Sequence, residues 1–146
     1  MSASLQRPMI SIVTPSFNSG NFIERCIQSV TAQNYPVMEH IVVDGGSKDI
    51  TLSILNKYQD KVHWVSEPDS GQSDAMNKGI RMAKGEIIGW INADDYYLPG
   101  AVQAVAREFV TQPDISMVHG DGWVEDLNGR VLHKVRAGEA NAKSIL

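Results

Sequence analysis

The sequence lacks the features that would bind nucleic acid, form disulfides or cross a membrane. Its 146 residues carry 13 Lys and Arg against 17 Asp and Glu, so the basic patch of a nucleic-acid-binding protein is absent and no nucleic-acid partner is expected. The one cysteine, Cys26, excludes an intrachain disulfide and a cysteine-based zinc site. No stretch approaches the ~20 apolar residues of a transmembrane segment, and residues 1–8 lack the apolar run of a signal peptide. We therefore expect a cytoplasmic protein.

Several common ligand-binding motifs are also missing. The sequence has no G-x-G-x-x-G run, no G-x-x-x-x-G-K-[ST] run and no nucleophile elbow, which argues against an ordinary NAD domain, a P-loop and a serine hydrolase. An acidic protein can still bind a phosphorylated ligand if positive charge is supplied locally, by backbone N–H groups, a helix N-terminus or a metal ion. The apolar fraction of 42% and the length fit one globular domain.

Short β-rich runs alternate with helical patterns along the chain. Helices are expected between the strands, including one over residues 73–84 and one that has Pro99 at its first position. Asn128-Gly129 indicates a two-residue hairpin turn. This alternation predicts an α/β fold, with a mostly parallel sheet, helices on both faces and a final β-hairpin. The expected strands of the sheet are residues 10–14, 40–43, 62–65, 87–91 and 115–118.

Ligands of such sheets bind at the carboxyl ends of the strands, where this chain has an acidic segment. Residues 92–95, Asn-Ala-Asp-Asp, directly follow an apolar strand. The adjacent carboxylates of Asp94 and Asp95 repel each other, and a hard cation such as Mg²⁺ or Mn²⁺ would remove that cost. A turn in which Asp94 caps the next helix explains the same residues, and the local sequence does not separate the two interpretations.

Three further polar segments contain candidate binding residues, each with an ordinary alternative. The segment after the first strand can face a ring, but it is also a plain strand-to-helix loop. Asp44 ends the second strand and can accept hydrogen bonds from a base or ribose, and a turn needs no acid there. Asp74 and Lys78 share one helix face at i, i+4, which is typical of an ion pair on a solvated helix as well as of a nucleotide contact.

Together these segments resemble the family 2 glycosyltransferases, which have the GT-A (Rossmann-like) fold. The resemblance covers roughly the first 100 residues, in the family's order and at its intervals, and weakens beyond Asp121. The matching segments are I-S-I-V-T-P-S-F-N at 10–18, I-V-V-D-G-G-S-K-D at 41–49, S-D-A-M-N-K-G-I at 73–80 and G-E-I-I-G-W-I-N-A-D-D at 85–95.

The resemblance implies a donor-binding domain over residues 1–146 of an enzyme that transfers a sugar. The donor would be a nucleotide-diphosphate sugar, UDP-linked by preference, and a carbohydrate or lipid-linked hydroxyl would accept the sugar with inversion at the anomeric carbon. Mg²⁺ or Mn²⁺ would assist. Peripheral membrane contact is left open, and so is self-association through apolar surface near Leu146.

The family's residue roles map onto this chain position by position. Thr14, Pro15 and Ser16 would line the base pocket. Asp44 would hydrogen-bond the base. Asp74 and Lys78 would lie near the base and the diphosphate.

The family's D-x-D motif aligns with residues 92–94. Asp94 would bind the metal, with Asp95 sharing that duty. Asn92 replaces the first acid of the motif and can still accept a hydrogen bond from a ribose hydroxyl.

The sequence departs from the family's pattern in its last third. The acceptor site and the carboxylate base of the family are expected outside these residues, because Glu125-Asp126 precedes the hairpin turn and is expected to face solvent. A donor-binding module without catalysis is therefore an alternative. A nucleotidyltransferase ranks lower, since residues 15–20 lack the Arg or Lys usual in the corresponding loop of that class.

Overall fold

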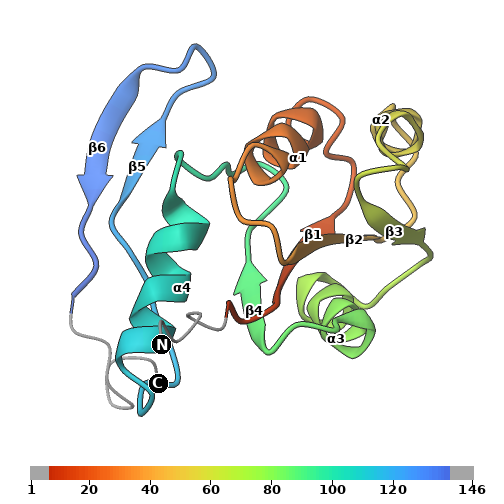
Figure 1. Ribbon diagram of the computed structural model, residues 1–146. Coiled ribbons are helices and arrows are strands. Elements are labelled where there is room, and N and C mark those ends of the chain that lie inside the picture. Colours follow the sequence, from red (N-terminus) through yellow and green to blue (C-terminus); the bar gives the residue numbers. More distant parts are fainter. Residues whose placement is uncertain (1–6, 139–146) are drawn as a thin grey trace.

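The computed structural model describes residues 7–138, and in that range a parallel α/β unit is followed by a β-hairpin (Figure 1). The expectations for residues 1–6 and 139–146, including the one near Leu146, lie outside the described residues. In chain order the elements are β1 (Ile10–Ser16), α1 (Ile23–Thr31), β2 (Met38–Asp44), α2 (Thr51–Lys57), β3 (His63–Ser66), α3 (Gln72–Met82), β4 (Ile87–Trp90), α4 (Ala101–Thr111), β5 (Gly122–Glu125) and β6 (Val131–Val135).

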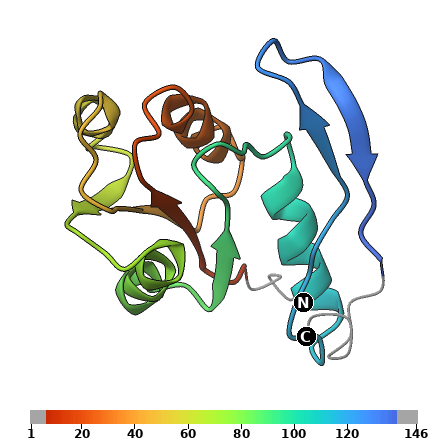
Figure 2. The ribbon, with the colours of Figure 1, turned by 180° about the vertical axis from the view of Figure 1, so that it is seen from behind.

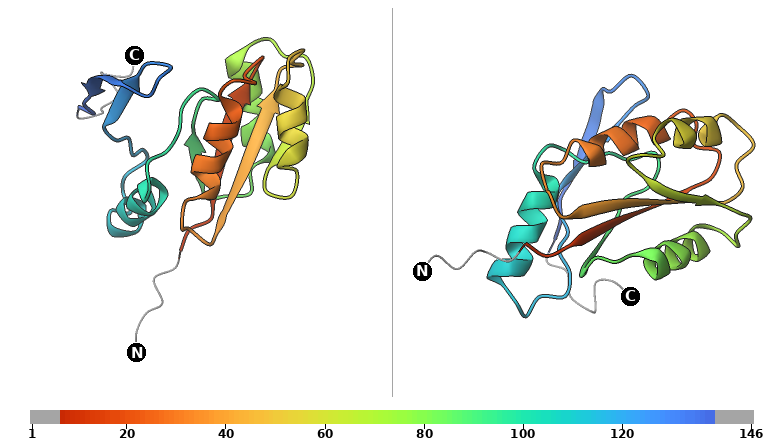
Figure 3. Two further views of the ribbon diagram at one scale, coloured as in Figure 1. Left: turned by 90° about the horizontal axis from the view of Figure 1, so that it is seen from above. Right: turned by 45° about the vertical axis from the view of Figure 1, so that its right-hand side comes forward.

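The four strands β1 to β4 form one parallel sheet in the order β3-β2-β1-β4. Helices α1 and α2 cover one face of this sheet, and α3 covers the other (Figure 3). Alternate residues of the strands therefore enter two apolar layers. Ile12 and Val42 pack with Ile27 on the α1 face, whereas Ile41 and Val43 pack with Ala75 on the α3 face. The predicted α/β fold with helices on both faces is confirmed.

Helix α3 packs on the sheet through a glycine. A Cβ atom on Gly79 would collide with the Val13 side chain of β1 and press on Val43 of β2. The absence of a side chain lets the helix backbone approach both strands. The first turn of α3 is thereby placed beside the carboxyl ends of β1 and β2.

Helix α4 and the hairpin lie beyond β4, on the side of the sheet away from β3 (Figures 1 and 2). Val102 and Ala106 join the apolar layer of α1. The buried Gln33 side chain links α1 to α4, because its amide donates to the Leu98 carbonyl at 3.1 Å and accepts from the Val102 N–H at 3.2 Å. Within the described residues, no helix is long and apolar enough to cross a membrane.

Two predicted features of the strands differ in the structure. Residues 115–118 do not form a strand, since β4 pairs only with β1 in the described sheet and the run has no strand to pair with. The first strand continues through Pro15 to Ser16 instead of ending at Thr14. Pairing with β4 ends at Val13, so Pro15 lies where β1 pairs on one side only and its missing N–H costs little.

Two turns also differ from their predicted form. Helix α4 begins at Ala101 with Gly100 before it, two residues after the predicted start at Pro99. The predicted hairpin forms, but residues 126–130 connect its strands. The Asp126 carboxylate accepts from two backbone N–H groups of this loop, and Gly129 has a φ of 77°, so a longer loop replaces the two-residue turn.

Candidate functional site

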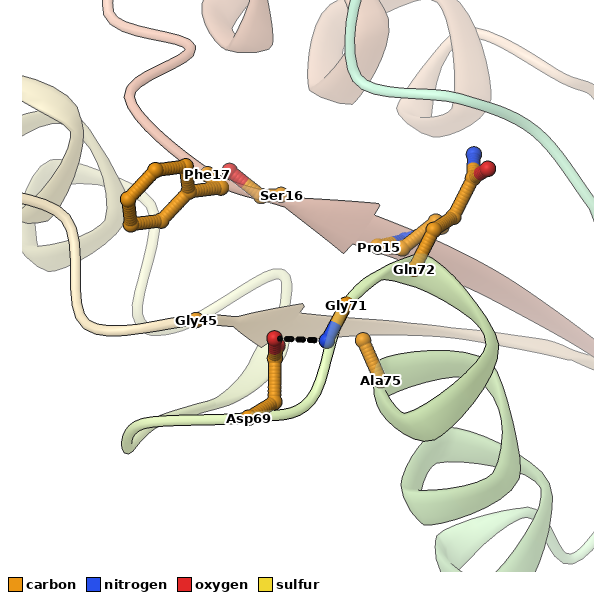
Figure 4. Close-up of a pocket in the computed structure, with 8 residues that line it drawn as sticks. All are labelled: Pro15, Ser16, Phe17, Gly45, Asp69, Gly71, Gln72 and Ala75. Carbon is orange, nitrogen blue, oxygen red and sulfur yellow. Dashed lines mark hydrogen bonds between the residues drawn. The ribbon is translucent and has the colours of Figure 1, made fainter.

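The carboxyl ends of β1 and β2 and the first turn of α3 surround a hollow of about 560 Å³ (Figure 4). Phe17 stands at its edge with 63% of its surface exposed, so its ring is open to a molecule in the hollow. Of the residues predicted to bind a base, Pro15 and Ser16 lie here. The lining residues are Pro15, Ser16, Phe17, Gly45, Asp69, Gly71, Gln72 and Ala75.

Thr14 faces the other side of β1, away from the hollow. Thr14 is fully buried, and its hydroxyl is hydrogen-bonded to Nε2 of His40 at 2.9 Å. Burial lowers the pKa of His40 to about 3, so its imidazole is neutral. The structure does not bring Thr14 to the hollow. The Ser16 hydroxyl is buried and has no hydrogen-bond partner within residues 7–138.

Asp44 ends β2 and organises the loop that follows it. One carboxylate oxygen accepts from the N–H groups of Gly46 and Ser47, at 3.1 and 2.9 Å, and from the Ser66 hydroxyl at 2.7 Å. The other accepts from the Ser47 hydroxyl. The Asp44 side chain is fully buried, and these protein donors surround its carboxylate.

Asp74 and Lys78 hold the loop between β3 and α3 against the helix. They form the predicted i, i+4 ion pair at 3.4 Å, and Lys78 also pairs with Glu67 at 2.9 Å. The Ser70 N–H donates to Asp74, which lowers the pKa of that carboxyl with further help from Lys78. Neither residue lines the hollow. They act on it indirectly, because the loop that they hold contains Asp69.

Asn92 connects the hollow to the acidic segment. Its side-chain oxygen accepts from the amide of Gln72, at the start of α3, at 2.7 Å and from the indole N–H of Trp90 at 2.9 Å. Gln72 lines the hollow, and Asn92 begins the turn that carries the two acids. The Asn92 side-chain oxygen thus links the start of α3 and Trp90 to the turn, and it does so only as a hydrogen-bond acceptor.

Asp94 and Asp95 lie exposed in the turn after β4. Partial burial, and then repulsion by Asp94, raises the pKa of Asp95, while the nearby Asn92 side chain lowers it. Within residues 7–138, no three His, Cys, Asp or Glu side chains lie together as a metal site. The two carboxylates thus offer hard oxygen ligands, but a cation there would need further oxygen ligands from a bound molecule.

A second cluster ties this turn to the hairpin. The Arg25 guanidinium lies 3.6 Å from the centroid of the Tyr96 ring and 3.3 Å from the Glu125 carboxylate. The Tyr96 hydroxyl donates to Glu125 at 2.7 Å, and this bond raises the pKa of Tyr96. The prediction that Glu125 faces solvent is therefore wrong, since its side chain is only 19% exposed.

A family model identifies the chain. The model described as "Glycosyl transferase family 2" matches residues 11–143. The chain belongs to glycosyl transferase family 2. Chondroitin synthase of Pasteurella multocida is 34% identical to this family 2 chain over 115 residues, which are 77% of the chain and 12% of that protein.

Solved structures agree with this assignment to family 2. TarS of Staphylococcus aureus, residues 1–349 in complex with UDP-GlcNAc, matches with a TM-score of 0.66 at 26% identity, over 72% of this chain and 32% of that TarS chain. The mannosyltransferase PcManGT of Pyrobaculum calidifontis, in complex with GDP-Man and Mn²⁺, matches with a TM-score of 0.65 at 26% identity, over 82% and 36%. The GT-A fold is confirmed, and the chain spans about a third or less of each of these relatives.

The structure adds three residues to the site predicted from the sequence. Phe17, Asp69 and Gln72 line the hollow, yet the sequence analysis gave none of them a role. Phe17 belongs to a matched segment, and an aromatic residue in a polar strand-end loop could have indicated its role. Asp69 and Gln72 gave no such signal, because they lie in a loop and a helix start whose distance from β1 is set only by folding.

Proposed function

We propose that the protein binds a UDP-sugar at this edge of the sheet and belongs to an enzyme that transfers the sugar to an acceptor hydroxyl. The observation that carries the proposal is the 2.7 Å hydrogen bond between Gln72 and Asn92, which links the hollow to the turn of Asp94 and Asp95. One bound molecule with a ring at one end and a diphosphate at the other would meet both parts.

The hollow suits the nucleoside end of such a donor. Pro15 and Phe17 supply apolar surface against which a planar base can lie, and an exposed ring of this kind stacks well on a base. Ser16 lines the hollow and its hydroxyl has no hydrogen-bond partner within residues 7–138, so this hydroxyl is the proposed donor to the ligand. Two of the three residues predicted for the base pocket, Pro15 and Ser16, keep that role in the proposal.

The acidic turn suits a divalent cation beneath the diphosphate. Asp94 and Asp95 would hold Mg²⁺ or Mn²⁺ through hard carboxylate oxygens, and diphosphate oxygens would complete the coordination. Mn²⁺ accompanies GDP-Man in the PcManGT structure, which supports this choice. The cation would supply positive charge to the departing nucleoside diphosphate. Asn92 would position the turn rather than bind the ribose, because Trp90 and Gln72 already donate to its oxygen.

Sugar transfer with inversion requires a base that removes the proton of the acceptor hydroxyl. We assign none of the described residues to that role, since Glu125 is held by Arg25 and Tyr96. The similarity to chondroitin synthase favours a carbohydrate acceptor, with a lipid-linked one as the alternative. Because the chain spans 12% of that relative, a donor-binding module that lacks catalysis on its own is the second candidate.

Calorimetric titration with UDP, in the presence and absence of Mn²⁺, tests the proposal. We expect Mn²⁺ to tighten UDP binding, and Asp94→Ala to remove at least about tenfold of that gain. Asp114→Ala, at another exposed aspartate, is the matched control and should keep it. If the UDP affinity is the same with and without Mn²⁺ and is unchanged by Asp94→Ala, the metal site is refuted. If neither UDP nor GDP binds, the donor site is refuted. UDP-, GDP- and dTDP-sugars offered to the full-length gene product then separate transfer from binding alone.

A further inference from the structure

Two aspartates, Asp44 and Asp69, stand beside the hollow, and they differ in what their carboxylates can still accept. Asp44 is fully buried and already accepts four hydrogen bonds, from Gly46, Ser47 and Ser66. A carboxylate has about four lone-pair sites, so little capacity is left, and a ligand cannot reach it. The acid that ends β2 therefore shapes the loop and does not touch a ligand.

Asp69 is half-buried and lines the hollow (Figure 4). One of its carboxylate oxygens accepts from the Gly71 N–H at 2.8 Å, which fixes the direction of the side chain. No other hydrogen bond to this carboxylate is found within residues 7–138. Its second oxygen therefore remains available to a ligand in the hollow.

A glycine makes room for this carboxylate. A Cβ atom on Gly45 would lie 2.8 Å from the second Asp69 oxygen and 3.1 Å from its carboxyl carbon, closer than such atoms normally approach. The carboxylate of Asp69 occupies the space that a side chain at position 45 would need. Gly45 and Asp69 thus form one unit, although residues 46–68, which include β3, lie between them in the chain.

We propose that Asp69 is the residue that reads the base of the nucleotide and that it selects a base carrying an imino N–H. This inference rests on the proposed function, because it names the recognition element of the same site. An ionised carboxylate only accepts hydrogen bonds. Uracil and guanine present a ring N–H at the edge opposite the sugar. Cytosine and adenine present a ring nitrogen there, which accepts hydrogen bonds as the carboxylate does, so the two acceptors repel each other. Asp69 therefore favours UDP or GDP over CDP and ADP.

Asp69→Asn provides a sharp test because Gly71 fixes which way the amide points. The Gly71 N–H retains the remaining oxygen, so the new NH₂ group faces the hollow. There it meets the N–H of uracil as donor against donor, but it can donate to the ring nitrogen of cytosine. We expect UDP affinity to fall by at least about tenfold and CDP affinity to rise, so that the ratio of the two approaches or passes one.

The titrations use UDP, GDP, CDP and ADP with Mn²⁺ on the wild-type protein and on three variants. Asp60→Asn, at an exposed turn after α2, is the matched control and should keep the wild-type ratio. Gly45→Ala should lower the UDP-to-CDP ratio with Asp69 intact, since the added methyl group displaces its carboxylate. Thermal unfolding of each variant separates a change in recognition from a loss of fold, and Asp69→Ala replaces Asp69→Asn if the latter does not fold.

The outcomes separate this inference from the proposed function. A wild-type protein that binds none of the four nucleotides overturns the proposed function and the inference with it. If UDP binds with Mn²⁺ but a folded Asp69→Asn protein, or Asp69→Ala in its place, keeps the wild-type UDP-to-CDP ratio, the role of Asp69 is overturned and the donor site stands. Equal affinity of the wild-type protein for all four nucleotides would also overturn the role of Asp69 and leave the donor site standing.

Discussion

Two carboxylates lie beside the hollow and two lie in the acidic turn, but the protein treats the two pairs in opposite ways. Beside the hollow, Asp44 and Asp69 accept hydrogen bonds from backbone N–H groups of the glycine-containing loops that follow them. In the turn, Asp94 and Asp95 are exposed neighbours, and within residues 7–138 no backbone N–H donates to either carboxylate. The carboxylates of Asp44 and Asp69 are thus oriented without a ligand, whereas those of Asp94 and Asp95 repel each other.

This difference indicates where each region obtains its order. Backbone donors fix the carboxylates of the hollow, so its shape should persist without a ligand. The turn lacks such donors, so a cation and a diphosphate would supply its order on binding. The Gln72–Asn92 bond is the direct link between the two regions. Each of the following predictions tests one side of this contrast or the link.

The largest expected effect comes from removing the charge of Asp44. Asp44→Asn places an NH₂ group among four donors in a fully buried position, so at least one hydrogen bond is lost and two donors face each other. We expect the free energy of unfolding to fall by about 3 kcal/mol. Urea denaturation followed by circular dichroism measures this change.

Asp60→Asn is the matched control for this prediction, because Asp60 is exposed in a turn. It should alter the unfolding free energy by no more than about 0.5 kcal/mol. An Asp44→Asn protein as stable as the control variant would show that the Asp44 hydrogen bonds do not hold the hollow together.

A smaller effect is expected from cutting the link between the regions. Gln72→Ala removes one of the two donors to the Asn92 side-chain oxygen and leaves the bond from Trp90. The gain in UDP affinity that Mn²⁺ provides should fall by about two- to tenfold, the usual worth of one hydrogen bond. Calorimetry with and without Mn²⁺ gives this gain as a ratio of two affinities.

Gln59→Ala, at an exposed position after α2, should leave that ratio unchanged. If Gln72→Ala weakens UDP binding equally with and without Mn²⁺, then Gln72 contacts the nucleotide but does not couple the two regions.

The contrast also explains which parts of the molecule could be predicted from its sequence. The sheet, its helices and the acidic turn after β4 follow local patterns of apolar residues and strand ends, and they were predicted. The strand expected at 115–118 depended on a partner strand that the described sheet does not provide. The place of Asp69 beside Gly45 depends on how β3 and α3 pack against β2, and no local pattern encodes it. The sequence likewise placed Asp44 correctly at a strand end but could not count its hydrogen bonds.

The smallest effect, and the most direct view of the contrast, is expected in the titration of single carboxyl groups. The Ser70 N–H, with Lys78 nearby, lowers the pKa of Asp74 beside the hollow, whereas burial and Asp94 raise the pKa of Asp95, both from an ordinary value of 3.8. Ionised Asp74 therefore stabilises the fold above its unfolded pKa, and this contribution is lost as the pH falls through its folded pKa. For Asp95 the sign is reversed, so its contribution is lost as the pH rises through its folded pKa.

Carboxyl NMR titration without metal should show Asp95 titrating at higher pH than Asp74. Asp94→Asn removes a negative neighbour and should lower the Asp95 midpoint while leaving that of Asp74 unchanged, and UDP with Mg²⁺ should lower it further, because a bound cation favours the carboxylate. An Asp95 midpoint at or below that of Asp74 in the metal-free protein would mean that the turn is already ordered by the protein itself, and the contrast between the two regions would not hold.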